Sequence, residues 1–185
     1  DGVYNDADQG IIGCGQPTFN WGWNNTFNYK NFDFSFFVVG FHGFDIYNAT
    51  HQMGYNLIKS QQMAGVTPMR ELLNRWTPTN TNTDIPGFVK GGTENKDFFS
   101  TRFVENGSFI KMKSITLGYT LPEATCRSLG INNLRVYASV QNPFHITKYS
   151  GLDPEATMGS PLVQGVDWGA YPNSRNYLIG LNFSF

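Results

Sequence analysis

The clearest pattern in the chain is the alternation of apolar and polar residues over its last twelve positions. Small or polar residues separate five apolar ones, with Leu178 as the exception: Tyr177, Ile179, Leu181, Phe183 and Phe185. A period of two predicts a β-strand with one apolar face and one polar face. A flat aromatic edge strand is a hazard in a soluble sheet, whereas a closed transmembrane barrel leaves no edge. The pattern therefore favours an outer-membrane β-barrel strand.

Four further stretches alternate in the same way, so that the predicted antiparallel strands are 18–29, 32–44, 108–121, 133–146 and 174–185. Lys30-Asn31 predicts a tight turn between the first two. Lys111 and Lys113 fall on the apolar face of the third strand. Either they reach up to the lipid headgroups, or a β-bulge switches the phase of the strand. Pro143 predicts a bulge or a strand end inside the fourth strand.

The connections between these strands alternate in length. Residues 30–31 and 122–132 are short, whereas 45–107 and 148–173 are long. Barrels of the outer membrane have short periplasmic turns and long extracellular loops. We therefore expect both long segments, and residues 1–17, to be extracellular and Phe185 to lie at the periplasmic end. Met53–Met63 and Met69–Trp76 have helical character, so the first long loop is expected to be partly ordered.

Composition agrees with a barrel wall. The chain has 185 residues, of which 16% are aromatic and only 15% are charged, with 20 Gly. No apolar run reaches the length of about 20 residues that a transmembrane helix needs. The net charge of −1 lacks a basic cluster, which makes nucleic acid an unexpected partner. Asp1 begins no recognisable export signal, so we interpret the chain as an internal piece of a longer protein.

No set of residues forms a catalytic pattern or predicts a cofactor, so the chain is not expected to be an enzyme. The histidines His42, His51 and His145 are scattered, and no carboxylate or Cys completes a metal spacing. Asp153 and Glu155 are too close in sequence to face each other across a glycosidase cleft. Cys14 and Cys126 fall at opposite ends of the predicted wall, farther apart than the roughly 7 Å between Cα atoms that a disulfide allows.

Aromatic residues of the long loops are the better functional candidates. Flat rings could stack on sugar rings, while neighbouring Asp167, Asn173 and Arg175 could bind hydroxyl groups. The alternative is that the rings pack the loops together or against a partner. The predicted ligand-binding residues are Trp76, Tyr149, Asp167, Trp168 and Tyr171. Rings on the predicted strands are expected to face lipid or to form the aromatic girdle at the headgroups: Trp21, Trp23, Tyr29, Tyr119 and Tyr177.

Several motifs, in order along nearly the whole chain, resemble one known family. They are Phe27-Asn-Tyr-Lys-Asn-Phe-Asp33, Asn74-Arg-Trp-Thr-Pro78, Asn80-Thr-Asn-Thr-Asp-Ile-Pro86, Arg102-Phe-Val-Glu-Asn-Gly-Ser108, Ile115-Thr-Leu-Gly-Tyr-Thr-Leu-Pro122, Leu134-Arg-Val-Tyr137, Gln141-Asn142, Thr147-Lys-Tyr-Ser-Gly-Leu-Asp-Pro-Glu155 and Gly169-Ala-Tyr-Pro172. The chain resembles the C-terminal part of the SusC/RagA-type TonB-linked outer-membrane transporters of Bacteroidetes. Pro143 stands where this family more often has Leu.

The resemblance implies a fold and a set of partners. The fold would be all-β, with these residues as the last five strands of a barrel of about 22 strands. The plug domain and first strands would lie in the missing remainder of the transporter. A SusD-like lipoprotein would form the lid, the TonB complex would supply energy, and the cargo would be an oligosaccharide or a peptide. The terminal residues Tyr177, Ile179, Leu181, Phe183 and Phe185 look like the signal read by the barrel-assembly machinery.

Two other interpretations remain open at this point. A soluble carbohydrate-binding β-sandwich could carry the same aromatic residues on a binding face, although loops such as 45–107 are long for it. A structural outer-membrane protein could instead form a small barrel with a second copy of itself. A need for detergent would separate the first of these from the barrel.

Overall fold

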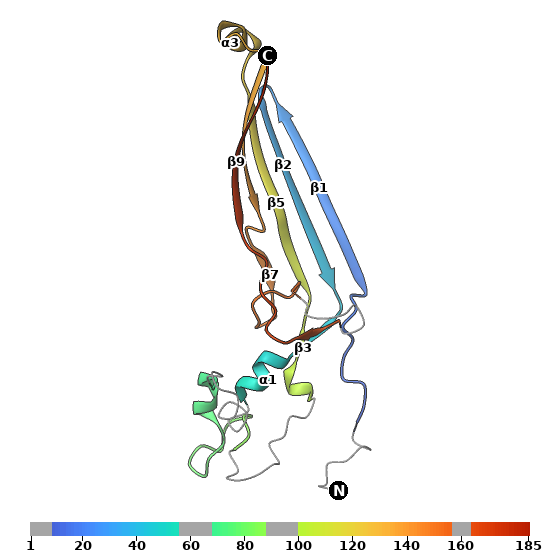
Figure 1. Cartoon of the computed structure of the whole chain (residues 1–185). Coiled ribbons are helices and arrows are strands. Elements are labelled where there is room, and N and C mark those ends of the chain that lie inside the picture. The colour runs from blue at the N-terminus through green and yellow to red at the C-terminus, as the bar shows by residue number, and fades with distance from the viewer. Residues whose placement is uncertain (1–8, 56–67, 88–99, 157–163) are drawn as a thin grey trace.

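The computed structural model describes residues 9–55, 68–87, 100–156 and 164–185. Its main feature is a tall, curved, single-layer antiparallel sheet (Figure 1). The long strands follow the order β1-β2-β5-β6-β9, and β7 also pairs with β5. Their bounds are β1 Phe19–Tyr29, β2 Phe32–His42, β5 Phe109–Thr120, β6 Asn133–Gln141, β7 His145–Thr147 and β9 Asn176–Ser184. The predicted all-β antiparallel fold class is thus confirmed.

The alternation along each strand sorts side chains onto two faces of the sheet. One row of directly paired residues runs across all five long strands and is wholly apolar: Phe27, Phe34, Leu117, Ala138 and Ile179. The next row carries Asn28, Asp33, Gly118, Tyr137 and Gly180. Because successive side chains of a strand point to opposite sides, the sheet has an apolar face and a largely polar face. The apolar face is uncovered: Ile179 is 84% exposed.

A β-bulge in β5 settles the phase of the two lysines. Phe37 of β2 pairs with Ser114, whereas Val38 pairs with Met112, so Lys113 is the extra residue. Lys111 then pairs with Val39, on the polar face of the sheet. The bulge interpretation is therefore correct. Snorkelling is wrong for Lys111, which is only 2% exposed.

The fourth predicted strand is split in two. β6 ends at Gln141, Asn142 has a φ of 50°, and Pro143 has no N–H to donate to a ladder. The chain then resumes as β7, which pairs with the beginning of β5 rather than with β9. The predicted strand 133–146 is thus interrupted at the proline, as its missing donor requires.

The long connections fold into a loop layer at one end of the sheet, opposite the short helix α3, Glu123–Ser128 (Figure 1). It contains β3 Asp45–Asn48, α1 Ala49–Tyr55, the 3₁₀ helices η2 Arg70–Asn74 and η3 Thr101–Phe103, β4 Val104–Asn106 and β8 Val166–Asp167. A second small sheet runs in the order β4-β3-β8. Its core joins Phe44, Ile46 and Tyr149 to Phe109 of β5, with Phe41 of β2 packed alongside. This core extends from the loop layer onto the sheet at the end of β2 where Phe41 lies.

The helical character expected for the first long loop is partly realised. α1 ends at Tyr55, and the remainder of the predicted segment Met53–Met63 lies outside the described residues. η2 falls within the predicted segment Met69–Trp76. Within the described ranges, no helix is long and apolar enough to cross a membrane. Cys14 and Cys126 are both free, the first beside β3 and the second in α3.

Candidate functional site

A group of four charges, two of them buried, joins the loop layer to the sheet. We call Lys111, Lys113, Asp153 and Glu155 the lysine clamp. Lys111 Nζ donates to Asp153 Oδ2 at 2.9 Å and to Glu155 Oε2 at 2.7 Å, and Lys113 Nζ donates to Glu155 Oε1. Asn173 adds its backbone N–H and side-chain amide to Asp153 Oδ2, each at 3.1 Å. Two cations and two anions are thus matched, and the second long loop is held at both of its ends.

The clamp keeps its carboxylates ionised. Burial by itself raises the pKa of Asp153, but hydrogen bonds from Lys111 and from backbone N–H groups, with the lysine charge, outweigh it and hold that pKa below its usual value. Burial also raises the pKa of Glu155, but hydrogen bonds from Lys111 and Lys113 and their charges outweigh burial. The pKa of Glu155 therefore also lies below its usual value. Asp153 and Glu155 therefore share lysine partners and do not face each other across an open cleft, which leaves no glycosidase geometry.

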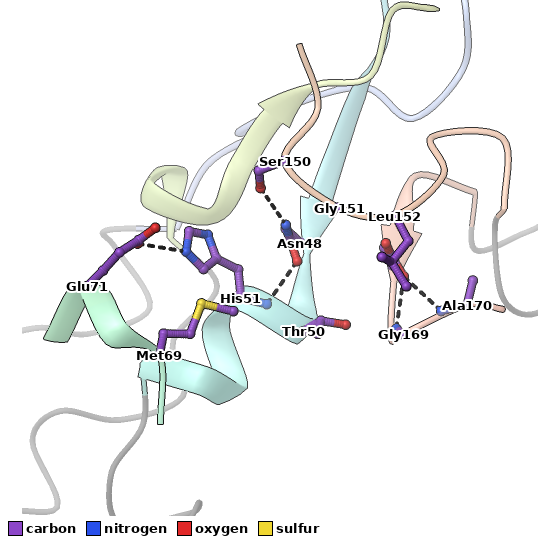
Figure 2. A pocket seen from close by; sticks show the side chains of 11 residues that line it. Asn48, Thr50, His51, Met69, Glu71, Ser150, Gly151, Leu152, Gly169 and Ala170 are labelled. Atoms are coloured by element: carbon purple, nitrogen blue, oxygen red, sulfur yellow. Dashed lines mark hydrogen bonds and ion pairs between the residues drawn. The ribbon is translucent and has the colours of Figure 1, made fainter. Parts of the chain in front are cut away.

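A partly enclosed pocket opens in the loop layer (Figure 2). Four segments form it: the β3–α1 junction, η2 with the residue before it, residues 150–152, and the turn after β8. The lining residues are Asn48, Thr50, His51, Met69, Glu71, Ser150, Gly151, Leu152, Asp167, Gly169 and Ala170. Polar groups and short apolar side chains thus converge on one cavity, which is how proteins commonly bind small ligands.

His51 lies at one side of this pocket, with a carboxylate near each ring nitrogen. Its Nε2 is 3.2 Å from Glu71 Oε2, and its Nδ1 is 3.7 Å from Glu105 Oε1. Tyr55 Oη donates to Glu71 Oε2 at 2.5 Å. The hydrogen bonds from Tyr55 and His51 lower the pKa of Glu71, while burial and Glu71 raise the pKa of Tyr55 to about 12. Glu71 is thus an anion at neutral pH and Tyr55 a neutral donor.

The predicted ligand residues Tyr149 and Asp167 bind each other. Tyr149 Oη donates to Asp167 Oδ2 at 2.6 Å, and both residues are buried. Asp167 Oδ1 accepts the backbone N–H groups of Gly169 and Ala170 at 2.8 and 3.0 Å. Burial and this carboxylate raise the pKa of the Tyr149 hydroxyl. The structure gives Tyr149 a packing role, while Asp167 shapes the turn and also lines the pocket.

The other three predicted ligand residues are accessible. Trp168 is 48% exposed and Tyr171 is 92% exposed, and they flank the pocket residues Gly169 and Ala170. Trp76 is 46% exposed, and its backbone N–H bonds to the carbonyl of Ile85 at 2.8 Å. Asn173 is engaged by the lysine clamp. Of the five predicted ligand residues, only Asp167 lines the pocket, while Trp168 and Tyr171 adjoin its lining residues Gly169 and Ala170 in sequence.

The five predicted girdle residues all lie on the apolar face. Tyr29 and Tyr119 share one row near the α3 end, since both pair with Phe32. Trp21 and Trp23 lie nearer the loop layer, where Trp21 covers Gly40. Tyr177 is the second residue of β9 and is 75% exposed. Their assignment to a headgroup girdle stays a prediction, as does the assembly signal read from Tyr177, Ile179, Leu181, Phe183 and Phe185.

Sequence reasoning missed most of the pocket. Asn48, Thr50, His51 and Glu71 carried no pattern, because a polar residue in a long loop looks solvated whichever way it points. The spacing of His51 and Tyr55, four residues apart, was the available signal for a shared helix face. Among the described residues, no three His, Cys, Asp or Glu side chains are grouped so as to hold a metal ion.

These features define a class of protein. An antiparallel sheet with an uncovered apolar face, a largely polar second face, short turns at one end and long connections at the other is the wall of an outer-membrane β-barrel. The chain belongs to the SusC/RagA-type TonB-dependent receptors of the outer membrane and matches their C-terminal part. The soluble β-sandwich interpretation is therefore wrong, because no second layer covers the apolar face of the described sheet.

The similarities cover nearly all of this chain. TonB-dependent receptor P3 of Formosa agariphila is 37% identical over 100% of the chain and 18% of its own length. TonB-dependent receptor SusC of Bacteroides thetaiotaomicron is 33% identical over 89% of the chain and 15% of its own length. The RagAB peptide importer in its closed-closed state matches with a TM-score of 0.77 and 28% identity, over 92% of the chain and 18% of that chain. The chain thus spans less than a fifth of the length of each of these relatives. No protein-family model matches it.

Proposed function

We propose that this chain forms part of the wall and outer loops of a TonB-dependent importer that takes up oligosaccharides. The observation that carries the proposal is the similarity to TonB-dependent receptors, SusC among them, over nearly the whole chain. A pocket with flanking aromatic rings at the loop end of the wall supports a role in cargo contact. No catalysis is assigned to the chain.

The partners follow from this assignment. The remainder of the transporter, with its plug and first strands, closes the barrel against the edges β1 and β9. A SusD-like lipoprotein covers the loop layer, the TonB complex acts through the remainder, and the barrel-assembly machinery inserts the chain into lipid. The similarity to the RagAB peptide importer and to SusC supports the lipoprotein partner and the rest of the transporter.

Trp168 and Tyr171 are assigned to stack on sugar rings, and Asp167 to accept hydroxyl hydrogen bonds at the pocket. Tyr149 positions Asp167 through their 2.6 Å hydrogen bond. Trp76 forms a separate contact on the loop layer. The exposure of the three rings supports these roles, since an aromatic face must be accessible to stack.

Calorimetric titration of oligosaccharides into the full receptor with its lipoprotein tests the proposal. Trp168→Ala should weaken binding about five- to tenfold, the effect of losing one aromatic contact of about 1 kcal/mol. Trp23→Ala, on the apolar face, is the matched control and should leave the affinity unchanged. Absence of any oligosaccharide binding would refute the function, and an unaffected Trp168→Ala would refute only the residue assignment.

Peptide import is the second candidate. The similar solved structures are of the RagAB peptide importer, at 28–30% sequence identity. A pocket lined by Glu71, Asp167 and Thr50 can accept hydrogen bonds from peptide amides as well as from sugars. The same titration with a defined peptide mixture separates the two, since only one cargo class should saturate the receptor.

A further inference from the structure

The hydrogen-bond donors of the pocket lining are directed at the protein itself (Figure 2). The Asn48 amide donates to Glu105 Oε1 at 2.9 Å and to Ser150 Oγ at 3.2 Å. The Ser150 hydroxyl donates to Glu105 Oε1 at 2.7 Å, and the Ser150 backbone N–H donates to Glu105 Oε2 at 2.8 Å. A cargo group that needs donors therefore finds these already engaged.

Asp167 contributes a buried negative charge to the lining, at 7% exposure. Its carboxyl group accepts three hydrogen bonds, from Tyr149 Oη at 2.6 Å and from the backbone N–H groups of Gly169 and Ala170 at 2.8 and 3.0 Å. A carboxyl group that only accepts hydrogen bonds is in its ionised form. The three bonds also hold the group in one orientation, so the charge has a fixed position in the wall of the pocket.

Glu71 contributes a second and more accessible negative charge. Its Oε2 accepts the Tyr55 hydroxyl at 2.5 Å and lies 3.2 Å from His51 Nε2. The hydrogen bonds from Tyr55 and His51 hold the pKa of Glu71 below its usual value. Its Oε1 has no partner among the described residues, and the side chain is 59% exposed. Glu71 can therefore accept a further hydrogen bond from a cargo group.

Cations do not offset these two charges. Among the described residues, none that lines the pocket is a lysine or an arginine. Arg70 and Lys148 lie close to lining segments in sequence but are not part of the lining. Arg102 pairs with Asp84 at 3.2 Å, and the lysines of the clamp pair with their own carboxylates. The lining thus combines two carboxylates with a shortage of free donors.

We propose that the pocket selects oligosaccharide cargo by charge, binding neutral or amino sugar units and excluding anionic ones, and that Glu71 determines this selectivity. Hydroxyl and ammonium groups can donate to the two carboxylates. Uronic acid and sulfate groups carry the same sign of charge and only accept, so that they meet repulsion and few donors. The inference rests on the proposed function, because it names the chemistry of the cargo that the same pocket takes.

The charge of the pocket can be measured without cargo. Leu152 lines the pocket and is 70% exposed, so a nitroxide on Leu152→Cys reports on its opening. The full receptor carries this change, with its accessible cysteines replaced by Ser. Electron paramagnetic resonance compares collisions of the nitroxide with a cationic and an anionic paramagnetic metal complex, at low salt and at about pH 8, where histidine is ordinarily neutral. Relative to the free label, the cation should collide roughly two- to fivefold more often than the anion.

Two matched variants assign this excess of cations. Glu71→Gln keeps the shape of the side chain and removes its charge, so the collision ratio should fall toward one. Glu123→Gln makes the same change of charge on α3, at the other end of the sheet, where the side chain is 83% exposed. This control should keep the ratio of the parent. The proposal is overturned if the anion collides as often as the cation, or if Glu71→Gln leaves the ratio unchanged.

Calorimetric titration with a matched pair of cargo probes completes the test. The probes are neutral glucan oligosaccharides and the same oligosaccharides after oxidation of their primary hydroxyls to carboxylates, which preserves length and linkage. The receptor should bind the neutral set about tenfold more tightly, a difference of about 1.4 kcal/mol. Glu71→Gln should narrow this difference, and so should about 1 M salt, which shortens the screening length to about 3 Å.

The outcomes separate this inference from the proposed function. Equal or tighter binding of the oxidised set would overturn the selection by charge and leave oligosaccharide import standing. Binding of neither set, with the excess of cations at the nitroxide intact, would refute the proposed function and leave the negative charge of the pocket established.

Discussion

The sheet and the loop layer are held together in different ways. In the sheet, each long strand pairs with its neighbours through a nearly continuous ladder, interrupted by a single register shift between β2 and β5. In the loop layer, strands are two to four residues long, and order depends on a few buried polar contacts such as the lysine clamp. The difference teaches that the loop layer depends on individual polar contacts, whereas the sheet depends on its ladders and on which face each side chain occupies.

The largest effect is expected for Lys111→Met. The substitution removes the cation that Asp153 and Glu155 share and leaves the buried Asp153 carboxylate without its ion-pair partner, which typically costs about 3–5 kcal/mol. Hydrogen exchange of the full receptor, followed over residues 150–156 and 170–176, should show loss of protection there, while β1 and β2 keep theirs.

Lys113→Met is the matched control for this prediction. Lys113 and Glu155 are 30% and 25% exposed, and Glu155 keeps Lys111, so exchange should change much less. Equal effects of the two substitutions would mean that burial of Lys111 is not what matters. Loss of protection along β1 and β2 would mean that the sheet depends on the loop layer.

Acid should release the same clamp. The pKa values of Asp153 and Glu155 are lowered in the folded protein, so their contribution to stability is fully present above the ordinary carboxyl pKa of about 4. That contribution is lost as the pH falls through the lowered folded values. Protection of residues 150–156 should therefore be constant from about pH 8 to about pH 5 and fall below about pH 4.

The next largest loss of stability is expected from placing an arginine on the apolar face of the sheet, compared with the polar face. Ile179 lies on the apolar face, which contacts lipid in the membrane, and its neighbour Leu178 lies on the polar face. Ile179→Arg should cost about 2–4 kcal/mol in the free energy of unfolding in lipid vesicles if the site is near the bilayer midplane. Leu178→Arg should cost much less, because its side chain points to the polar side. A reversed order of the two would overturn the assignment of the faces.

The same difference explains what the sequence could and could not predict. A period of two is local, so alternation located the long strands to within a few residues of β1, β5 and β9. The bulge at Lys113 was open because both phases were compatible with the sequence. The clamp and the pocket depend on contacts between residues such as Lys111 and Asp153, 42 positions apart, and no periodicity encodes such a pairing. The sequence identified the aromatic residues of the loops, but it could not tell that Tyr149 is buried while Trp168 and Tyr171 are exposed.

A smaller loss of stability is expected for Gly118→Ala, in the sheet itself. Arg135 reaches Asp33 across the polar face, with Nε to Oδ1 at 2.8 Å and Nη2 to Oδ2 at 2.5 Å, and it does so directly over Gly118. A Cβ at this position would overlap both charged groups, so the ion pair must shift. Because it is partly exposed, we expect a loss of about 1–2 kcal/mol in the free energy of unfolding.

Gly22→Ala provides the comparison within the same face. There the added Cβ would meet the Phe37 ring at 3.2 Å, a contact that a small ring movement relieves, and alanine restricts the unfolded chain. Its unfolding free energy should stay within about 0.5 kcal/mol of the parent. If Gly22→Ala were as costly as Gly118→Ala, glycine would be required by the strand backbone and not by the ion pair above it. If both were neutral, the ion pair would be as adaptable as the rest of the sheet, and specific polar contacts would matter only in the loop layer.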